Sequence, residues 1–218
     1  MDFNLTEEQR SFQNSVRNLA ESHLSQRNLE RAHDPNFPKD VAKLFAKNGL
    51  MGITLPEKDG GQGGKLMDAV IAIEQVALVC PRSADVIQSG SFGPLRTFAE
   101  YASDFQKEKY LSKLLTGEIV IALGMTEPNA GSALTDLTTK AEVKGDKIII
   151  NGTKRWCSGG GHSEGYVVYC KMSDAPGAKG IGAVYVEKDS KGLSFGLQES
   201  LMGWNGVPSA DIFLDSVE

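Results

Sequence analysis

The chain has 218 residues, of which 40% are hydrophobic, and its formal net charge is -5 at pH 7. This length and apolar content allow a sizeable core and two domains, which excludes a disordered segment. The acidic balance argues against DNA or RNA as a partner, because nucleic-acid binding requires a clustered excess of Lys and Arg.

Cysteine usage and the apolar runs indicate the compartment. Cys80, Cys157 and Cys170 have no CxxC spacing, which indicates neither a disulfide framework nor a metal site and favours a reducing compartment. Residues 1–9 contain three acidic side chains and no basic one, so we expect no signal peptide and a cytoplasmic protein. The longest apolar stretch, residues 69–80, is too short to cross a bilayer, so it predicts a buried helix and no membrane attachment.

The first half of the chain has the signals of successive helices. Thr6 and Gln9 form a capping-box pattern, and apolar residues then recur at helical spacing, which predicts a first helix. Pro38 suits the first turn of a second helix, and Asn48-Gly49 provide a left-handed stop. The apolar residues expected on the inward faces are Leu5, Phe12, Val16, Leu19, Val41, Leu44 and Phe45.

A glycine-rich loop, a longer helix and a pair of shorter helices follow. The longer helix is predicted over residues 65–79 and the pair over about residues 83–115, with breaks at Pro81 and Gly93-Pro94. The loop matches a phosphate-binding loop only superficially, because Asp59 replaces that motif's first glycine. We therefore expect an all-helical region in which nearly all apolar residues form a core.

From Ile119 onward, short β-prone runs replace the helical pattern. The runs cover residues 138–143, 147–150, 153–157, 166–172, 181–186, 193–198 and 210–214. Turn signals at Gly145-Asp146, Asn151-Gly152 and Gly177 separate several of them. The sequence therefore predicts an α+β fold, in which an all-α helical N-terminal domain (residues 1–117) precedes an antiparallel β-barrel-like domain (residues 118–218).

The segment MTEPNAGS, residues 125–132, has the composition of a ligand-binding loop. A Pro beside an Asn-Ala-Gly-Ser turn prevents helix and continuous strand, and it leaves hydroxyl and backbone N–H groups unpaired. Such donors suit the pyrimidine edge of an isoalloxazine ring, whose face also needs an aromatic or apolar wall. Trp156 is the candidate for that wall, while an ordinary core position for Trp156 and a simple turn role for Thr126 remain alternatives.

One catalytic motif is rejected. Residues 161–165, GHSEG, match the G-x-S-x-G elbow of serine hydrolases. That elbow joins a strand to a helix, whereas a β-prone run follows here at once. His162 is expected to be an exposed loop residue, and no catalytic residue is assigned.

Five segments give the chain an end-to-end resemblance to the acyl-CoA dehydrogenase family. They are residues 1–9 (MDFNLTEEQ), 55–64 (LPEKDGGQGG), 126–132 (TEPNAGS), 151–158 (NGTKRWCS) and 201–218 (LMGWNGVPSADIFLDSVE). The resemblance implies an FAD-dependent oxidoreductase of fatty acid metabolism that converts an acyl-CoA to a 2-enoyl-CoA. It also implies an electron-transferring flavoprotein as partner, with the turn at Glu199 near its docking surface, and a homo-oligomer, either a dimer or a homotetramer.

The resemblance further implies cofactor contacts, carried over residue by residue. The matching positions are Leu123, Gly124, Met125, Thr126, Gly131, Ser132, Trp156, Cys157 and Ser158. In the family pattern Thr126 hydrogen-bonds the pyrimidine edge of FAD, Trp156 covers the ring, and Ser132 also contacts the acyl-CoA. No metal is expected.

The chain departs from the family pattern in two respects. Ala133 stands where Asp is usual, and Leu123 where an aromatic residue is common. The family's catalytic base, a Glu in a third, C-terminal helical domain, has no counterpart here, because Glu127 belongs to the loop and is expected to be structural. We therefore expect a truncated chain that is inactive by itself. A non-catalytic acyl-CoA-binding relative or fragment, and a flavin-dependent oxidase or lyase of the same fold, remain alternatives.

Overall fold

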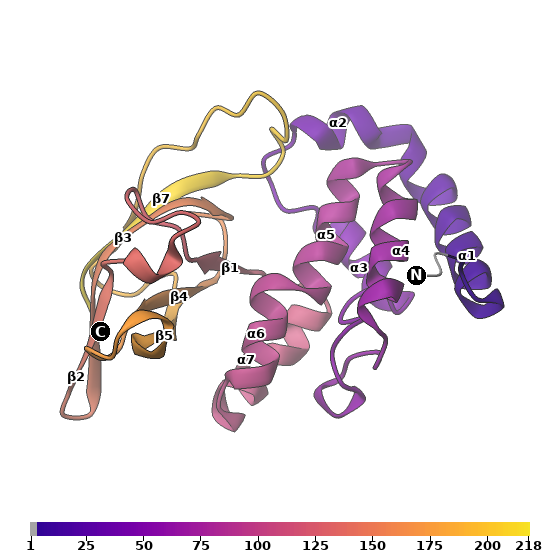
Figure 1. The fold of residues 1–218 in the computed structure, drawn as a ribbon. Helices are drawn as coiled ribbons and strands as arrows, with labels where there is room; N and C mark the ends of the chain where they lie inside the picture. The colour runs from indigo at the N-terminus through magenta and orange to yellow at the C-terminus, as the bar shows by residue number, and fades with distance from the viewer. Residues whose placement is uncertain (1–3) are drawn as a thin grey trace. The chain divides into compact units, whose positions relative to one another are not determined.

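The computed structural model describes residues 4–218, and the chain divides into two compact units. Unit 1 consists of the residues up to Ile119 together with Gly203–Gly206, and unit 2 of Val120–Met202 together with Val207–Glu218. Unit 1 is helical and unit 2 holds the sheet, so the predicted α+β fold class is confirmed (Figure 1). Residues 1–3 of the opening family-like segment lie outside the described residues.

Unit 1 is built from the helices α1 (Glu7–Leu24), α2 (Asn28–His33), α3 (Lys39–Lys47), α4 (Leu66–Ala77), α5 (Pro81–Ser91), α6 (Gly93–Tyr101) and α7 (Asp104–Leu115), with 3-10 turns η1 (Ser25–Arg27) and η2 (Glu57–Asp59). The apolar faces of α1, α3, α4 and α5 share one core. The predicted capping box is present, since the Gln9 N–H donates to Thr6 Oγ1 at 3.2 Å and the Thr6 N–H to Gln9 Oε1 at 3.0 Å. Val16 and Phe45 are buried, as expected for the inward faces of α1 and α3.

Three helical details extend or correct the predictions. The stretch predicted as a pair of helices forms three, because Pro81 and Pro94 begin α5 and α6 at positions where an N–H would have no helical partner. α2 was not predicted, since its six residues are too few to show helical periodicity. α4 forms where a buried helix was expected over residues 69–80, but only one of its faces is buried, since Leu66, Met67 and Val70 are exposed. None of the helices within residues 4–218 is long and apolar enough to pass through a bilayer.

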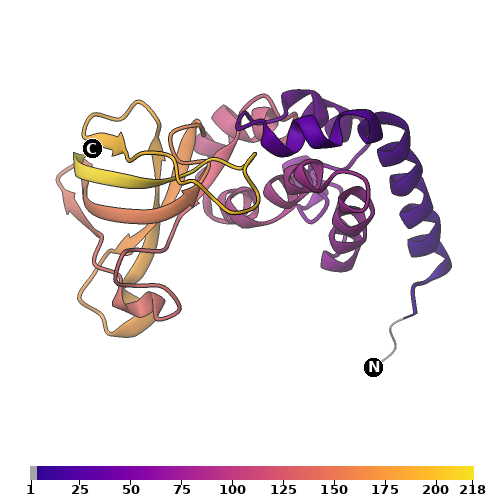
Figure 2. The same cartoon turned by 90° about the horizontal axis from the view of Figure 1, so that it is seen from above.

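Unit 2 is a curled mixed sheet, drawn from two directions in Figures 1 and 2, with the strand order β1-β4-β2-β3-β7-β6 and β5 paired with β4. The strands are β1 (Ile121–Gly124), β2 (Lys140–Lys144), β3 (Lys147–Ser158), β4 (Gly165–Lys171), β5 (Ile181–Glu187), β6 (Leu193–Phe195) and β7 (Ser209–Val217), and η3 (Leu134–Asp136) and η4 (Gly177–Gly180) are 3-10 turns. Most neighbouring strands are antiparallel, as predicted, but β1 runs parallel to β4 and β2 meets β4 in a single parallel pair. Parallel pairs join segments far apart in sequence, so no local turn signal reveals them.

β3 is one continuous strand, so the turn predicted at Asn151-Gly152 is wrong. β2 and β3 form a hairpin that turns at Gly145-Asp146, as predicted, and Gly145 has a φ of 69°. Gly152 instead lies so close to the segment before β2 that a Cβ there would be 2.4 Å from Thr139 Oγ1. This glycine is therefore required by the close approach of two segments, not by a turn.

Candidate cofactor site

The loop after β1 is closed by a tight turn at its centre. Glu127 and Ala130 exchange backbone hydrogen bonds with N–O distances of 3.0 and 3.1 Å, so Pro128 and Asn129 form the tip. Pro128 has no N–H with which to continue a strand ladder, in agreement with the irregular loop expected from the sequence. The other polar groups of the loop are therefore available for other partners.

The carboxylate of Glu127 anchors this loop to the sheet. It accepts hydrogen bonds from the Thr138 N–H at 2.6 Å, the Thr138 hydroxyl at 2.8 Å and the Thr139 N–H at 2.9 Å. Lys154 Nζ also donates to it at 2.8 Å, and both side chains are buried. Burial by itself would raise the pKa of Glu127, but the hydrogen bonds from Lys154 and from Thr138-Thr139 outweigh that effect and lower this pKa to about 2. Glu127 is therefore ionised and fully engaged, which suits an anchoring role.

β3 holds the loop backbone on both sides of Thr126. Lys154 Nζ donates to the Met125 carbonyl at 3.1 Å, and the Arg155 N–H donates to the Thr126 carbonyl at 2.8 Å. Lys154 is completely buried, so its ammonium group depends on these acceptors. Two successive carbonyls of the loop are thereby directed toward β3.

Trp156 lies in a β-bulge that turns its indole ring outward. A register shift between β3 and β7 sets Arg155 and Trp156 opposite the single residue Asp211. Trp156 has a φ of 54°, which is rare for a bulky residue, and it is 60% exposed. The Arg155 guanidinium carbon lies 5.5 Å from the centroid of the indole ring. This exposure excludes the alternative that Trp156 is an ordinary core residue.

Besides Thr153 in β3, three hydroxyl groups close to the loop and the bulge have no hydrogen-bond partner within residues 4–218. They belong to Thr126, which is half-buried, and to Ser132 and Ser158, which are exposed. At Gly131 the position of the missing Cβ is surrounded by open space. Unpaired donors on the loop, and on the strand that carries an exposed aromatic ring, are the kinds of group that a planar, electron-rich ligand requires.

The remaining residues predicted to contact the cofactor lie partly in the sheet and partly on the exposed loop. Leu123 and Gly124 end β1, and the Cys157 thiol donates to the Leu123 carbonyl at 3.3 Å. Burial raises the pKa of Cys157 to about 12, so this thiol packs against β1 and is no nucleophile at neutral pH. Gly131 and Ser132 are exposed, and neither donates a hydrogen bond to β3 in the part of the chain that the structure describes.

Sequence reasoning missed two residues of this site, Lys154 and Arg155. A signal for Lys154 was present, because it stands four positions after the buried Ile150 and alternate residues of a strand share a face. Its buried partner Glu127 is distant in sequence, and nothing local links the two. Arg155 had no signal, since its place beside the indole depends on the bulge.

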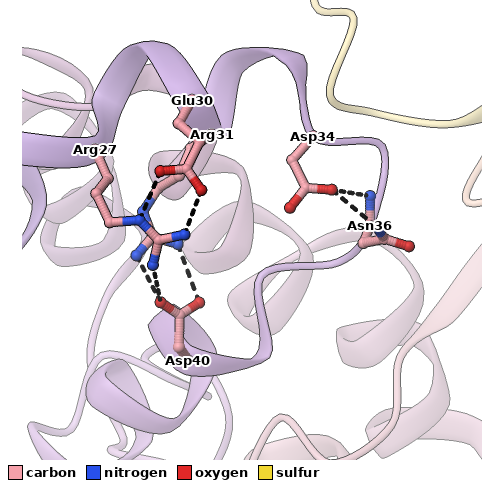
Figure 3. A network of polar contacts seen from close by, with 6 residues as sticks. All are labelled: Arg27, Glu30, Arg31, Asp34, Asn36 and Asp40. Carbon is pink, nitrogen blue, oxygen red and sulfur yellow. Dashed lines mark hydrogen bonds and ion pairs between the residues drawn. The ribbon is translucent and has the colours of Figure 1, made fainter.

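Unit 1 has a charged cluster of its own, at the junction of α2 and α3. Figure 3 shows Arg31 and Arg27 directed at the Asp40 carboxylate, with Glu30 bound to Arg27. Arg31 donates hydrogen bonds to both carboxylate oxygens of Asp40, at 3.0 and 2.5 Å. The adjoining cavity of about 440 Å³ is lined by four basic and three acidic side chains. Its charges nearly balance, so we assign the cluster to helix packing. Within the described residues no group of three or more His, Cys, Asp or Glu is placed to hold a metal ion.

Two family models match the chain. The first, described as acyl-CoA dehydrogenase, N-terminal domain, matches residues 6–118. The second, described as acyl-CoA dehydrogenase, middle domain, matches residues 122–217 and includes the loop and the bulge described above.

Individual relatives agree with these models. The short-chain-specific acyl-CoA dehydrogenase of Clostridium acetobutylicum is 32% identical over 217 residues, which is 100% of this chain and 57% of the relative. The structure of butyryl-CoA dehydrogenase from Megasphaera elsdenii is 28% identical with a TM-score of 0.84, and the match covers 100% of this chain and 58% of that one. A chain solved in work on the electron transferring flavoprotein of Acidaminococcus fermentans is 30% identical with a TM-score of 0.84, covering 100% of this chain and 57% of that one. The present chain thus spans little more than half the length of these proteins.

Proposed function

The chain belongs to the acyl-CoA dehydrogenase family, and on this premise we propose that it is the N-terminal and middle part of an FAD-dependent enzyme. The complete protein would oxidise an acyl-CoA thioester to a 2-enoyl-CoA. In this proposal residues 1–117 form the family's helical domain and residues 118–218 its middle β domain. The observation that carries it is the exposed Trp156 ring on β3, the strand whose Arg155 N–H holds the Thr126 carbonyl of the loop, within the segment that matches the middle-domain model.

We propose the following residues as contacts of the cofactor: Leu123, Gly124, Met125, Thr126, Gly131, Ser132, Trp156, Cys157 and Ser158. Thr126 would donate to the pyrimidine edge of FAD, Trp156 would cover one face of the ring, and Ser132 would also contact the acyl-CoA. When bound, FAD supplies the acceptor for the β-hydrogen and its electron pair, while a base takes the α-proton. The residues of this chain would bind the ring, orient it and cover it from water.

We assign the base to a part of the complete protein other than this chain. Glu127 is the carboxylate of the loop itself, and its four hydrogen bonds leave it no free lone pair directed at a substrate. A pKa of about 2 also makes it a poor proton acceptor at neutral pH. We therefore propose that this chain binds the cofactor but is inactive by itself.

We further propose that the complete enzyme is a homo-oligomer, a dimer or a tetramer, that passes electrons to an electron-transferring flavoprotein. The resemblance to a chain solved in work on such a flavoprotein supports this partner. The turn at Glu199 is our candidate docking region, and Leu197 and Met202 beside it are almost fully exposed. Three buried free cysteines suit a reducing, cytoplasmic location.

The first test is a visible absorption spectrum of the purified chain after incubation with FAD and desalting. We expect a retained flavin band. We also expect Thr126→Ala to weaken FAD binding by about tenfold, because one hydrogen bond between neutral groups is lost. Thr135→Ala, which removes an exposed hydroxyl from η3, is the matched control and should bind as the unchanged chain does.

Other outcomes would favour the alternatives. A folded chain that stays colourless but binds an acyl-CoA in calorimetry would support a non-catalytic thioester-binding relative. A completed protein that is reduced by acyl-CoA but reoxidised directly by oxygen would support an oxidase of the same fold.

A further inference from the structure

Lys154 is the least expected residue of the site, because a completely buried lysine is rare. Its residue exposure is 0%, and it lies in the middle of β3. An ammonium group in a protein interior is tolerated when an opposite charge and hydrogen-bond acceptors surround it. Lys154 has two such acceptors, Glu127 Oε1 at 2.8 Å and the Met125 carbonyl oxygen at 3.1 Å.

The second acceptor connects Lys154 to the proposed cofactor contact at Thr126. The Met125 carbonyl and the Thr126 N–H belong to the same peptide group. The Thr126 N–H has no partner within residues 4–218, whereas the Thr126 carbonyl is engaged by the Arg155 N–H at 2.8 Å. The ammonium group therefore binds one end of a peptide whose other end is free to donate.

A positive charge bound at a carbonyl oxygen strengthens the N–H of the same peptide group as a hydrogen-bond donor. Hydrogen bonds in a chain polarise one another, and a charged donor in a low-dielectric interior does so more strongly than a neutral one. Electron density is drawn toward the Met125 oxygen, so the Thr126 N–H becomes a stronger donor. The same contact fixes the plane of the peptide, and hence the direction of that N–H.

We propose that Lys154 is a positioning residue that acts through the Met125–Thr126 peptide to favour the reduced flavin over the oxidised one. The inference rests on the proposed function, since it needs a flavin beside Thr126. Two-electron reduction, FAD + 2e⁻ + H⁺ → FADH⁻, adds negative charge to the ring. A strengthened donor at the ring's electron-rich edge stabilises that charge more than it stabilises the neutral oxidised ring.

The test compares the midpoint potential of FAD bound to the unchanged chain and to the double variant Lys154→Met with Glu127→Gln. Both residues are changed together, because a single substitution would leave an unpaired charge in the interior. We expect the ratio of affinities for reduced and oxidised FAD to fall about three- to tenfold, which lowers a two-electron potential by roughly 15–30 mV. The dissociation constant of oxidised FAD, from fluorescence titration, should change less than that of the reduced form.

A matched control removes another ion pair from the same strand. Lys147→Met with Glu218→Gln breaks the exposed pair at the other end of β3 and should leave the potential unchanged. If the first double variant does not fold, as judged by its circular dichroism, Lys154→Gln with Glu127→Gln keeps neutral hydrogen-bonding groups at both positions. The same lowering of the potential is expected from it.

The outcomes separate the two proposals. A chain that holds FAD, but whose potential is the same in the Lys154 variants, overturns the role of Lys154 and leaves the flavin assignment intact. Equal weakening of both redox forms would also overturn it, because that result indicates loop packing alone. An unchanged chain that retains no FAD overturns the proposed function of this chain, and the role of Lys154 falls with it.

Discussion

Trp156 combines a strained backbone with an exposed aromatic ring, and neither feature serves the packing of the sheet. A bulky residue in the left-handed region costs about 1–3 kcal/mol, and an exposed indole contributes little burial to offset it. Such a conformation persists when its surroundings impose it. Here the bulge opposite Asp211 does so, and its effect is to present the ring.

Replacing Trp156 with Gly should therefore separate stability from binding. Gly relieves the strain of the positive φ, but it loses the partial burial of the indole and gives the unfolded chain more freedom, so we expect these effects to offset and the free energy of unfolding in urea to change by less than about 1 kcal/mol. FAD affinity should fall by at least about tenfold, because the aromatic wall is lost. Trp156→Phe, which keeps a ring, should retain most of the affinity. A large loss of stability in Trp156→Gly would instead mean that the indole is needed for packing.

Glu127 makes the stability of unit 2 dependent on pH. Its pKa is lowered from the model-peptide value of 4.5 to about 2 in the folded chain. A lowered folded-state pKa stabilises the protein at pH above the unfolded value, and this contribution is lost as pH falls from about 4.5 toward 2. We expect a loss of up to about 3 kcal/mol in this window, measured as the free energy of unfolding at successive pH values. Glu127→Gln should be less stable at pH 7 and should show a shallower pH dependence.

At the scale of elements, the ion-pair cluster of unit 1 joins α2 to the first turn of α3. Asp40 follows Lys39, the first residue of α3, where a negative charge also favours the helix dipole. Its hydrogen bonds from the buried Arg31 lower the pKa of Asp40 and give both terminal nitrogens of that guanidinium a charged acceptor. One side chain therefore stabilises both the start of α3 and the position of α2.

Asp40→Asn should accordingly destabilise unit 1 by about 1–2 kcal/mol, because Arg31 loses its charged acceptor inside the protein. Glu30→Gln is the matched control, since Glu30 pairs with Arg27 on the exposed side of the same cluster. Exposed pairs contribute little, so this variant should unfold nearly as the unchanged chain does. Thermal unfolding followed by circular dichroism checks both variants. Equal effects would show that Arg31 does not depend on Asp40.

At the scale of the whole molecule, the chain divides into a helical and a sheet unit, each with its own core. The family models also divide it in two, at residues 118 and 122. The candidate cofactor groups described above all lie in unit 2, on β1, the following loop and β3. Because the chain spans little more than half of its relatives, their complete activities belong to longer proteins, and the properties open to measurement on this chain are binding, potential and stability.

Local signals in the sequence were sufficient to predict the fold class, the family and the irregular loop at residues 125–132. The capping box at Thr6 and Gln9, the stop at Gly49 and the hairpin turn at Gly145 depend on neighbours within a few residues, and all three are present in the structure. The Pro128-Asn129 turn belongs to the same class. These features follow from backbone sterics and short-range hydrogen bonds, which a sequence displays directly.

Only the tertiary structure determined how the strands and the loop are placed against one another. The parallel pairing of β1 with β4, the bulge that exposes Trp156, and the burial of Lys154 against Glu127 all join residues that are distant in the chain or set by a partner strand. The Asn151-Gly152 pair illustrates the difference between local and long-range signals. It has the local pattern of a turn, yet it lies within the continuous strand β3, where Gly152 packs closely against Thr139. Local propensities are worth tenths of a kcal/mol to about 1 kcal/mol each, whereas burial and strand pairing contribute more, so long-range contacts determined the geometry of the site.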